Sequence, residues 1–521
     1  MRRGGVVAVA MVLGWYALAL ATLHPLADGP VADSWIYAES VRWFRASGEF
    51  RFVGYTEAMP LAQILYGAAW GSIFGTSAVS FDLANVCLAI VAALMLYGLA
   101  IRCGAPMWQA FVASALLVCN PCFLFLSFSF MSEIGFIAAL VGSHLAFACW
   151  ADAHRMLCLW IAAGLALIAF SIRPFGGIAI IGPLAAMLIY DAKSIRWRSV
   201  LMPFAIALIG CGLIWLWMTV LRPAPWKLLQ RETVLANFLR VAPWEYLRMG
   251  VLGPLLYLGI VLSPLAILRL NPRALMLAAA IFVTTVIVTR VGIAMPSTPE
   301  MSCFGGWSNA LILRGLPNRF EWHDAWRYAL VLLGSLGAAG FIFAAIDAIP
   351  NLTRASSAVI IAAAMYWLAL IPLWLFNDRY FLVLLPAAAL ILAMAPMPEH
   401  LPMRIAVFAM TFVMGVMSLG GVYSYQRGLA AVMAARDALE KRGVTRADID
   451  AGYELNGLDL YPFPDDPRHM PDVPMITSSK LSEYTIAAAP IDGTEMVATI
   501  LSPGPFGLGS RRIYVVRRID K

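Results

Sequence analysis

Thirteen stretches of this 521-residue chain are apolar enough to cross a lipid bilayer as helices. A hydrocarbon core of roughly 30 Å needs about 20 apolar residues per helix. Within lipid a helix satisfies its own backbone polar groups, which an open strand does not. The stretches lie near residues 6–24, 79–100, 108–122, 131–150, 156–171, 175–190, 199–221, 250–268, 275–294, 326–346, 356–376, 380–397 and 404–423. They predict an all-α polytopic membrane protein.

Composition supports this class and argues against a nucleic-acid partner. Hydrophobic residues make up 61% of the chain and charged residues 13%, whereas soluble domains carry about 25% charged residues. The net charge of +7 is concentrated in short loops, as the positive-inside rule predicts for a membrane protein. We therefore expect lipids as neighbours and no nucleic acid.

The basic loops set the expected orientation. With a cytoplasmic N-terminus, the predicted inner loops hold Arg102, Arg155, Lys193, Arg196, Arg198, Arg269, Arg273, Arg354 and Arg404. The first span lacks a convincing cleavage site and is expected to stay in place. An odd number of spans puts the C-terminus outside, and we expect the bacterial inner membrane. Residues 58–75, which are apolar but interrupted by Gln63 and glycines, predict an interfacial or re-entrant helix. Counting them as a span would reverse the orientation downstream.

The chain divides into two predicted domains, a transmembrane domain over 1–425 and a small extracytoplasmic α+β domain over 426–521. The first carries three long outer loops, at 25–57, 222–249 and 295–325. The second begins with an amphipathic helix over 428–442, which Gly443 ends. Its predicted short strands are 448–461, 484–488, 496–501 and 512–516.

The first outer loop carries the leading candidate for chemistry, Asp33. It lies in an acidic, aromatic segment with Asp28 and Tyr37. An amphipathic helix is predicted over 32–46, lying flat in the membrane interface with Glu39 on its polar face. A carboxylate at the membrane surface can accept a proton from an attacking hydroxyl or amine, hold a metal ion, or orient an acceptor. The alternatives are a solvated carboxylate, or an N-cap for a helix that starts at Ser34.

Glu133 and Arg173 are two further candidates at outer helix ends. Glu133 follows Phe130-Met-Ser in apolar surroundings, where its short side chain favours a pocket as much as a helix end exposed to water. Arg173 precedes Pro174 at a turn between two apolar helices. A guanidinium there suits a phosphate, and lipid head-group anchoring is the competing interpretation.

The remaining candidates lie in other outer segments. Asp378, Arg379 and Tyr380 form a polar group in which the first two residues can simply pair with each other. Lys227 and His323 lie in the second and third long loops. The chain has no nucleotide-binding glycine loop, no zinc-protease histidine motif and no Gly-x-Ser-x-Gly. Its six histidines form no metal cluster.

Taken in order, these weak motifs resemble the GT-C class of polytopic glycosyltransferases. The similarity is greatest to its bacterial branch, which is related to protein O-mannosyltransferases and the lipid A aminoarabinose transferase. It covers roughly residues 1–425 and is carried by Asp33-Ser-Trp-Ile-Tyr37, Met59-Pro-Leu-Ala-Gln63, Phe130-Met-Ser-Glu133, Arg173, and Asp378-Arg379-Tyr380 with Pro386. The family often has two adjacent acids where this chain has Asp33-Ser34, and Pro-Pro where it has Met59-Pro60 after Glu57.

The resemblance implies an inverting glycosyltransferase that uses a polyprenyl-phosphate sugar at the extracytoplasmic face. The acceptor would be a lipid, a polysaccharide or a protein of the envelope. Asp33 would serve as base or orienting acid, with Glu133 beside it. Arg173, Arg379 and Lys227 would bind the donor phosphate. No cofactor is assigned with certainty, and a divalent metal ion stays open.

Two other functions stay open. A transporter or flippase for lipid-linked glycans predicts charges along mid-membrane helices, whereas here they gather at helix ends. A ligase or polymerase of lipid-linked glycans shares the location and the lipid chemistry. The C-terminal domain then binds an acceptor, binds a partner or caps the bundle.

Overall fold

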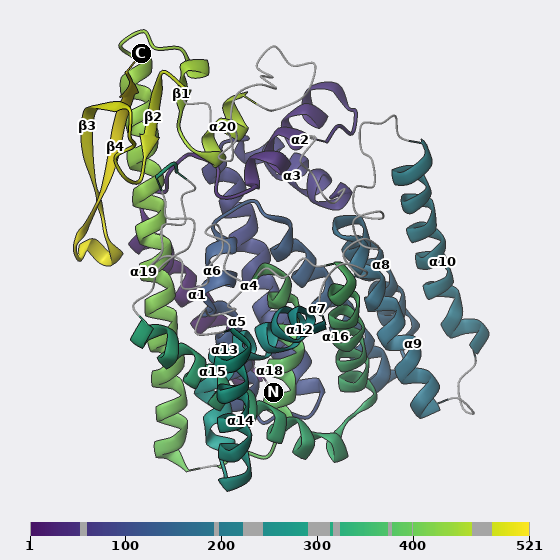
Figure 1. Cartoon of the computed structure of the whole chain (residues 1–521). Helices are drawn as coiled ribbons and strands as arrows, with labels where there is room; N and C mark the ends of the chain where they lie inside the picture. The colour runs from purple at the N-terminus through teal and green to yellow at the C-terminus, as the bar shows by residue number, and fades with distance from the viewer. Residues whose placement is uncertain are drawn as a thin grey trace.

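The computed structural model is a helical bundle with a small sheet at one end (Figure 1). It describes residues 2–52, 60–191, 197–221, 243–289, 313–315, 324–373, 378–398, 400–460 and 482–519.

Within these ranges, nine helices are long and apolar enough to span a membrane. They are α1 (Arg2–Leu23), α4 (Ala78–Arg102), α7 (Ser132–Ala153), α9 (Ile178–Asp191) with the preceding turn Pro174–Gly177, α10 (Trp197–Leu216), α13 (Gly253–Ala266) with the helical turns Tyr246–Leu252 before it and Ile267–Arg269 after it, α15 (Asp324–Ala348), α16 (Arg354–Leu373) and α19 (Leu401–Glu440). The helices α5 (Met107–Val118) and α6 (Pro121–Ser127) make one further span at most, because they are bent by 63° at their junction.

Each of the thirteen predicted spans corresponds to helical structure, but the count of thirteen is not confirmed. Three of them are shorter apolar helices, α8 (Met156–Ile172), α14 (Pro272–Thr289) and α18 (Leu385–Met394), the last preceded by α17 (Asp378–Phe381). A fourth short apolar helix, α3 (Leu61–Phe74), occupies the segment predicted to be interfacial or re-entrant. At about 1.5 Å rise per residue, its 14 residues span about 21 Å.

Small residues allow the closest helix contacts in the bundle. A Cβ built on Gly337 of α15 would lie 1.9 Å from the carbonyl oxygen of Gly259 on α13. Likewise, a Cβ on Gly182 of α9 would lie 2.3 Å from the carbonyl oxygen of Ala358 on α16. Such glycines let two backbones approach, which is how apolar helices gain packing energy where lipid competes equally for apolar surface.

The two ends of the membrane-spanning helices differ in the residues that they carry. At one end α4 begins beside the first loop, where Val79 N–H donates to Asp28 Oδ1 at 3.2 Å. At the opposite end, basic residues of the predicted inner loops form ion pairs with neighbouring helices: Arg102 with Asp152, Arg269 with Asp347, and Arg354 with Asp191. The arginine-rich ends of these helices therefore lie together, away from the first loop.

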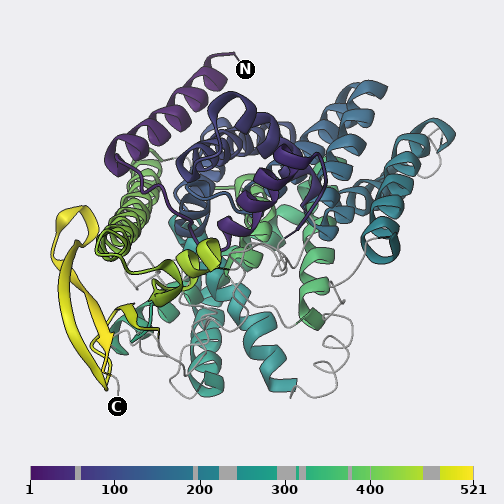
Figure 2. The same cartoon turned by 90° about the horizontal axis from the view of Figure 1, so that it is seen from above.

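The helix α19 connects the bundle to the C-terminal sheet. It is continuous from Leu401 to Glu440 and runs the height of the molecule (Figure 1). The predicted span at 404–423 and the amphipathic helix at 428–442 are therefore one helix, and the predicted boundary at residue 425 falls inside it. Viewed from above, the sheet lies to one side of the bundle, next to α19 (Figure 2).

The C-terminal sheet has four strands in the order β1-β2-β4-β3. They are β1 (Ile449–Asp450), β2 (Tyr484–Ala487), β3 (Thr494–Pro503) and β4 (Ser510–Arg518). β1 pairs parallel to β2, and the other neighbours are antiparallel. The last three strands contain the segments predicted at 484–488, 496–501 and 512–516, apart from Ala488.

The strand predicted over 448–461 is wrong. Only β1 is extended there, and the chain then forms the helix α20 (Tyr453–Leu460). Asn456 closes the turn between them, because its Oδ1 accepts from Ala451 N–H at 2.9 Å and its Nδ2 donates to Asp450 at 2.8 Å. Gly452, with a φ of +90°, starts the helix. These contacts of the Asn456 side chain within the segment favour a turn and a helix over a strand.

Candidate functional site

Asp33 lies at the start of α2 (Ser34–Ser47), the short helix of the first loop. It occupies the N-cap position but makes no side-chain capping bond. Its Oδ2 accepts from Arg379 Nη1 at 2.9 Å, and its Oδ1 accepts from Tyr453 Oη at 2.7 Å. The capping alternative is therefore excluded, and the carboxylate joins three segments that are far apart in the sequence.

The prediction that α2 lies flat in the interface with Glu39 on a polar face needs correction. Residues Ser34 to Val41 are all buried, including Glu39, which forms an ion pair with Arg42 of the next turn. Protein covers this part of the helix on several sides.

Glu133 and Arg173 form a buried ion pair. Arg173 Nη2 donates to Glu133 Oε1 at 2.6 Å, and its Nε and Nη2 both donate to Ser132 Oγ, at 3.0 and 2.9 Å. Glu133 lies in the first turn of α7, where the helix dipole favours a carboxylate. Its side chain is 0% exposed, and its Oε2 has no hydrogen-bond partner among the described residues.

A tight turn positions Arg173. The residue ends α8, and Pro174 begins the next turn with no N–H of its own to continue the helix. Gly176 then packs against the end of α8, where a Cβ would lie 2.1 Å from the backbone nitrogen of Phe170. Only a glycine allows the chain to fold back this closely, so the turn holds the guanidinium near the start of α7.

Arg379 links the two carboxylates. Its Nη1 donates to Asp33, and its Nε lies 3.5 Å from Glu133 Oε1. One cluster of two carboxylates and two guanidiniums therefore forms, from Asp33, Glu133, Arg173 and Arg379. Asp33 is the most exposed of the four, at 21%, followed by Arg379 at 13% and Arg173 at 9%.

Two tyrosines line this cluster. The Tyr380 ring lies 5.6 Å from the Arg173 guanidinium carbon and 5.3 Å from that of Arg379, within cation–π range. Ser132 Oγ donates to Tyr37 Oη at 3.4 Å. Burial raises the pKa of Tyr37 to about 12, although Arg173 opposes the shift. Tyr37 is therefore a protonated hydroxyl, not a base, at any physiological pH.

The other predicted site residues lie away from this cluster or outside the residues that the structure describes. Glu57, Lys227 and His323 lie outside the described residues, and of Asp378 only the backbone, in α17, is described. The expected pairing of Asp378 with Arg379 is therefore not tested, whereas Arg379 pairs with Asp33.

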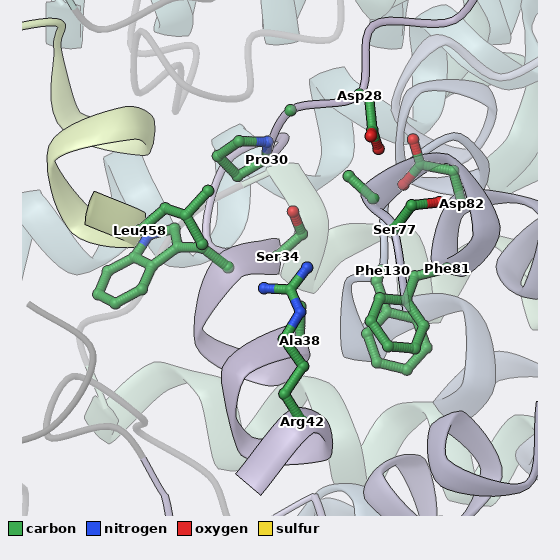
Figure 3. A pocket seen from close by; sticks show the side chains of 13 residues that line it. Asp28, Pro30, Ser34, Ala38, Arg42, Ser77, Phe81, Asp82, Phe130 and Leu458 are labelled. Carbon is green, nitrogen blue, oxygen red and sulfur yellow. The ribbon is translucent and has the colours of Figure 1, made fainter. Parts of the chain in front are cut away.

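Asp28 lines a cavity of about 90 Å³ that adjoins α2 on a different face from Asp33 and Tyr37 (Figure 3). Its carboxylate lies beside that of Asp82, while Arg42 extends toward Ser34. Asp82 is buried, and within the described part of the chain its Oδ2 has no hydrogen-bond partner. Ser34, Ala38 and Arg42 follow at helical spacing on this face of α2, and neither Asp33 nor Tyr37 lines the cavity.

No group of three or more His, Cys, Asp or Glu side chains that could hold a metal ion occurs among the residues that the structure describes.

Sequence reasoning missed two residues of the cluster. Ser132 lies in the motif Phe130-Met-Ser-Glu133, in which only Glu133 is predicted to have a role. The signal that points to Ser132 is a hydroxyl directly next to an isolated acid in apolar surroundings. Tyr453 lies 420 positions from Asp33 in a segment interpreted as a strand. No local pattern in the sequence identifies it.

No family model matches the chain, and no curated protein sequence matches it. Solved structures do. Over 90% of its length the chain is similar to the oligosaccharyltransferase AglB from Archaeoglobus fulgidus, solved with an inhibitory peptide and a dolichol-phosphate, at 15% identity and a TM-score of 0.47. The chain spans 61% of the length of that protein.

Two further similarities are of the same kind. ArnT from Cupriavidus metallidurans, bound to undecaprenyl phosphate, matches over 97% of this chain and 98% of its own, at 14% identity and a TM-score of 0.41. The Pmt1-Pmt2 protein O-mannosyltransferase of S. cerevisiae, bound to its sugar donor, matches over 40% of this chain and 32% of its own, at 16% identity and a TM-score of 0.32. These neighbours are glycosyltransferases of the GT-C class, which the sequence resembles. Since every TM-score is below 0.5, the proposal below rests on this chain's own side chains.

Proposed function

We propose that this chain is an integral-membrane glycosyltransferase. It transfers a sugar from a polyprenyl-phosphate donor to an envelope acceptor, which is a lipid, a polysaccharide or a protein, at the extracytoplasmic face. The observation that carries the proposal is the Asp33–Arg379 pair, a partly exposed carboxylate against a guanidinium, at one end of an apolar bundle.

The chemistry needs little beyond these groups. A sugar on a polyprenyl phosphate is already activated, so the protein must position the acceptor and neutralise the departing phosphate. Asp33 accepts the proton from the acceptor hydroxyl or amine as that atom bonds to the anomeric carbon. The bond from that carbon to the phosphate oxygen breaks, and the charge that develops there meets Arg379 and Arg173. A single displacement of this kind inverts the anomeric centre.

Substrate binding exchanges partners within the cluster. In the structure both guanidiniums are paired with carboxylates, so the four side chains carry no net charge. A donor phosphate must compete with Asp33 for Arg379, which frees the carboxylate for the acceptor. Glu133 is fully buried and cannot reach a substrate without moving, so its proposed role is to fix Arg173 and Arg379.

The orientation follows from the two ends of the spans. The arginine-rich ends lie opposite the end of α4 that contacts the first loop. Because cytoplasmic loops carry the excess of Lys and Arg, we assign the site and the C-terminal domain to the extracytoplasmic face. A polyprenyl chain lies in the bilayer with its phosphate at the interface, where this site would meet it.

The test is transfer from a labelled polyprenyl-phosphate sugar in membranes that contain Asp33→Asn. The variant keeps the shape of the side chain and loses its charge, and we expect transfer to fall about 100-fold or more, as when one catalytic electrostatic contact is lost. Asp28→Asn is the matched control, because Asp28 lies in the same loop but on a different face of α2. Full transfer by Asp33→Asn would remove Asp33 from the mechanism.

The same assay separates the competing functions. A glycosyltransferase forms a new glycosidic bond to an acceptor, which mass spectrometry of the envelope glycans of a deletion strain and its parent detects. Translocation of a labelled lipid-linked glycan in vesicles without any new bond would instead identify a flippase.

A further inference from the structure

Among the residues that the structure describes, helix α20 brings the C-terminal domain to the proposed site. Its first residue, Tyr453, donates its hydroxyl to Asp33 Oδ1 at 2.7 Å, while Arg379 holds Oδ2. The two oxygens of Asp33 therefore have donors from opposite parts of the chain. Each donor restrains rotation of the carboxylate, and Tyr453 keeps its hold on Oδ1 if Arg379 moves away.

The helix α20 packs closely against α2. A Cβ built on Gly457 would lie 2.3 Å from the Trp35 ring, so a glycine is needed where the α20 backbone meets the indole. Trp35 itself is 1% exposed. Because Trp35 lies two residues after Asp33 and Gly457 one turn after Tyr453, this contact sets the spacing between the hydroxyl and the carboxylate.

Tyr425 of α19 bonds to a chain neighbour of each residue in the Tyr453–Asp33 hydrogen bond. Its hydroxyl donates to Glu454 Oε1 at 3.3 Å and accepts from Ala32 N–H at 3.4 Å. Glu454 follows Tyr453, and Ala32 precedes Asp33. Ala32 has a φ of +49°, a backbone conformation that is costly for a residue other than glycine and persists only where its surroundings impose it.

The far end of α20 is held as well. Asp459 accepts from Arg436 at 2.8 Å and from Arg446 at 2.9 Å. With Asn456 closing the turn from β1, the helix is fixed at its start, its middle and its end.

We propose that Tyr453 is a positioning residue for Asp33, and that the C-terminal domain is thereby a component of the catalytic site. This rests on the proposed function and deepens it. Tyr453 does not touch the substrate. It holds Asp33 Oδ1 so that the carboxylate meets the acceptor in one orientation when the donor phosphate draws Arg379 away.

The experiment uses the full-length protein in membranes and the variant Tyr453→Phe, which removes one oxygen atom and keeps the ring. We expect kcat for transfer to fall roughly tenfold to a hundredfold, the range for losing a hydrogen bond to a charged group. KM for the donor and the midpoint of thermal unfolding should stay close to those of the parent. Tyr484→Phe is the matched control, because it removes the same atom from β2 of the same domain.

A second variant tests the seating of α20. Gly457→Ala places a methyl group against Trp35 and should lower kcat, with little further loss when it is combined with Tyr453→Phe. Unchanged kcat in Tyr453→Phe, with or without a lower unfolding midpoint, would overturn the proposal and leave α20 as a structural cap.

Asp33→Asn distinguishes this failure from failure of the proposed function. If Asp33→Asn is inactive while Tyr453→Phe is fully active, only the positioning role is lost. If Asp33→Asn is itself fully active, the function proposed for Asp33 fails first.

Discussion

Replacing Arg173 by Met tests whether the Glu133–Arg173 pair is a charged pair in a dry environment. The Met side chain keeps most of the length of Arg173 and removes its charge. Glu133 is then left fully buried. Among the residues that the structure describes, Arg379 Nε at 3.5 Å is the cation that remains beside it, and one of its oxygens already has no hydrogen-bond partner. Breaking a buried pair by removing one partner costs about 3–5 kcal/mol.

That free energy converts to a measurable shift. Unfolding entropy is about 2.1 cal/mol/K per residue in soluble proteins, so for 521 residues a change of 1 kcal/mol moves the midpoint of thermal unfolding by about 1 °C. We therefore expect Arg173→Met to unfold roughly 3–5 °C below the parent. The assay is thermal unfolding of the purified protein in detergent, compared at one protein concentration and pH.

A double variant that removes both charges can refute this reasoning. Arg173→Met combined with Glu133→Gln removes both charges, so it should unfold well above Arg173→Met alone and recover at least about half of the lost stability. If the double variant unfolds at the same temperature as Arg173→Met or below it, Glu133 carries no uncompensated charge in the single variant. The reasoning about the cluster would then be wrong.

Three smaller predictions follow from other contacts. Since burial raises the pKa of Tyr37 to about 12, Tyr37 contributes to a fall in folding stability as the pH rises from 10 toward 12, and Tyr37→Phe should make that fall smaller than in the parent while leaving the pH–rate profile between pH 6 and 9 unchanged in shape. Gly337→Leu should sharply lower the yield of folded protein in detergent, because α13 lies against that position, whereas Gly164→Leu faces open space and should not. Asp152→Asn removes an exposed pair with Arg102 and should shift the unfolding midpoint by less than about 1 °C.

The sequence predicts the membrane elements well because lipid imposes one rule on every span. Apolar length alone locates thirteen helical segments, and within the interrupted stretch Leu61–Phe74 forms a short helix. Length alone could not show which segments cross the bilayer, because helix ends and bends depend on neighbours. Thus Asn120 and Pro121 start a new helix at 63° to α5, although the apolar run continues through them.

Single residues of the site were predictable where burial of a charge is expensive. Glu133, Arg173 and Arg379 stand out because an ionisable group beside apolar spans needs a partner, although the sequence could not show that the partners are one another. Tyr453 is different, because a tyrosine in a soluble segment carries no such cost, and its importance comes only from where α20 packs. A C-terminal segment that looked like a separate soluble domain therefore contributes to the site through Gly457 and Trp35, a contact that no pattern within either segment encodes.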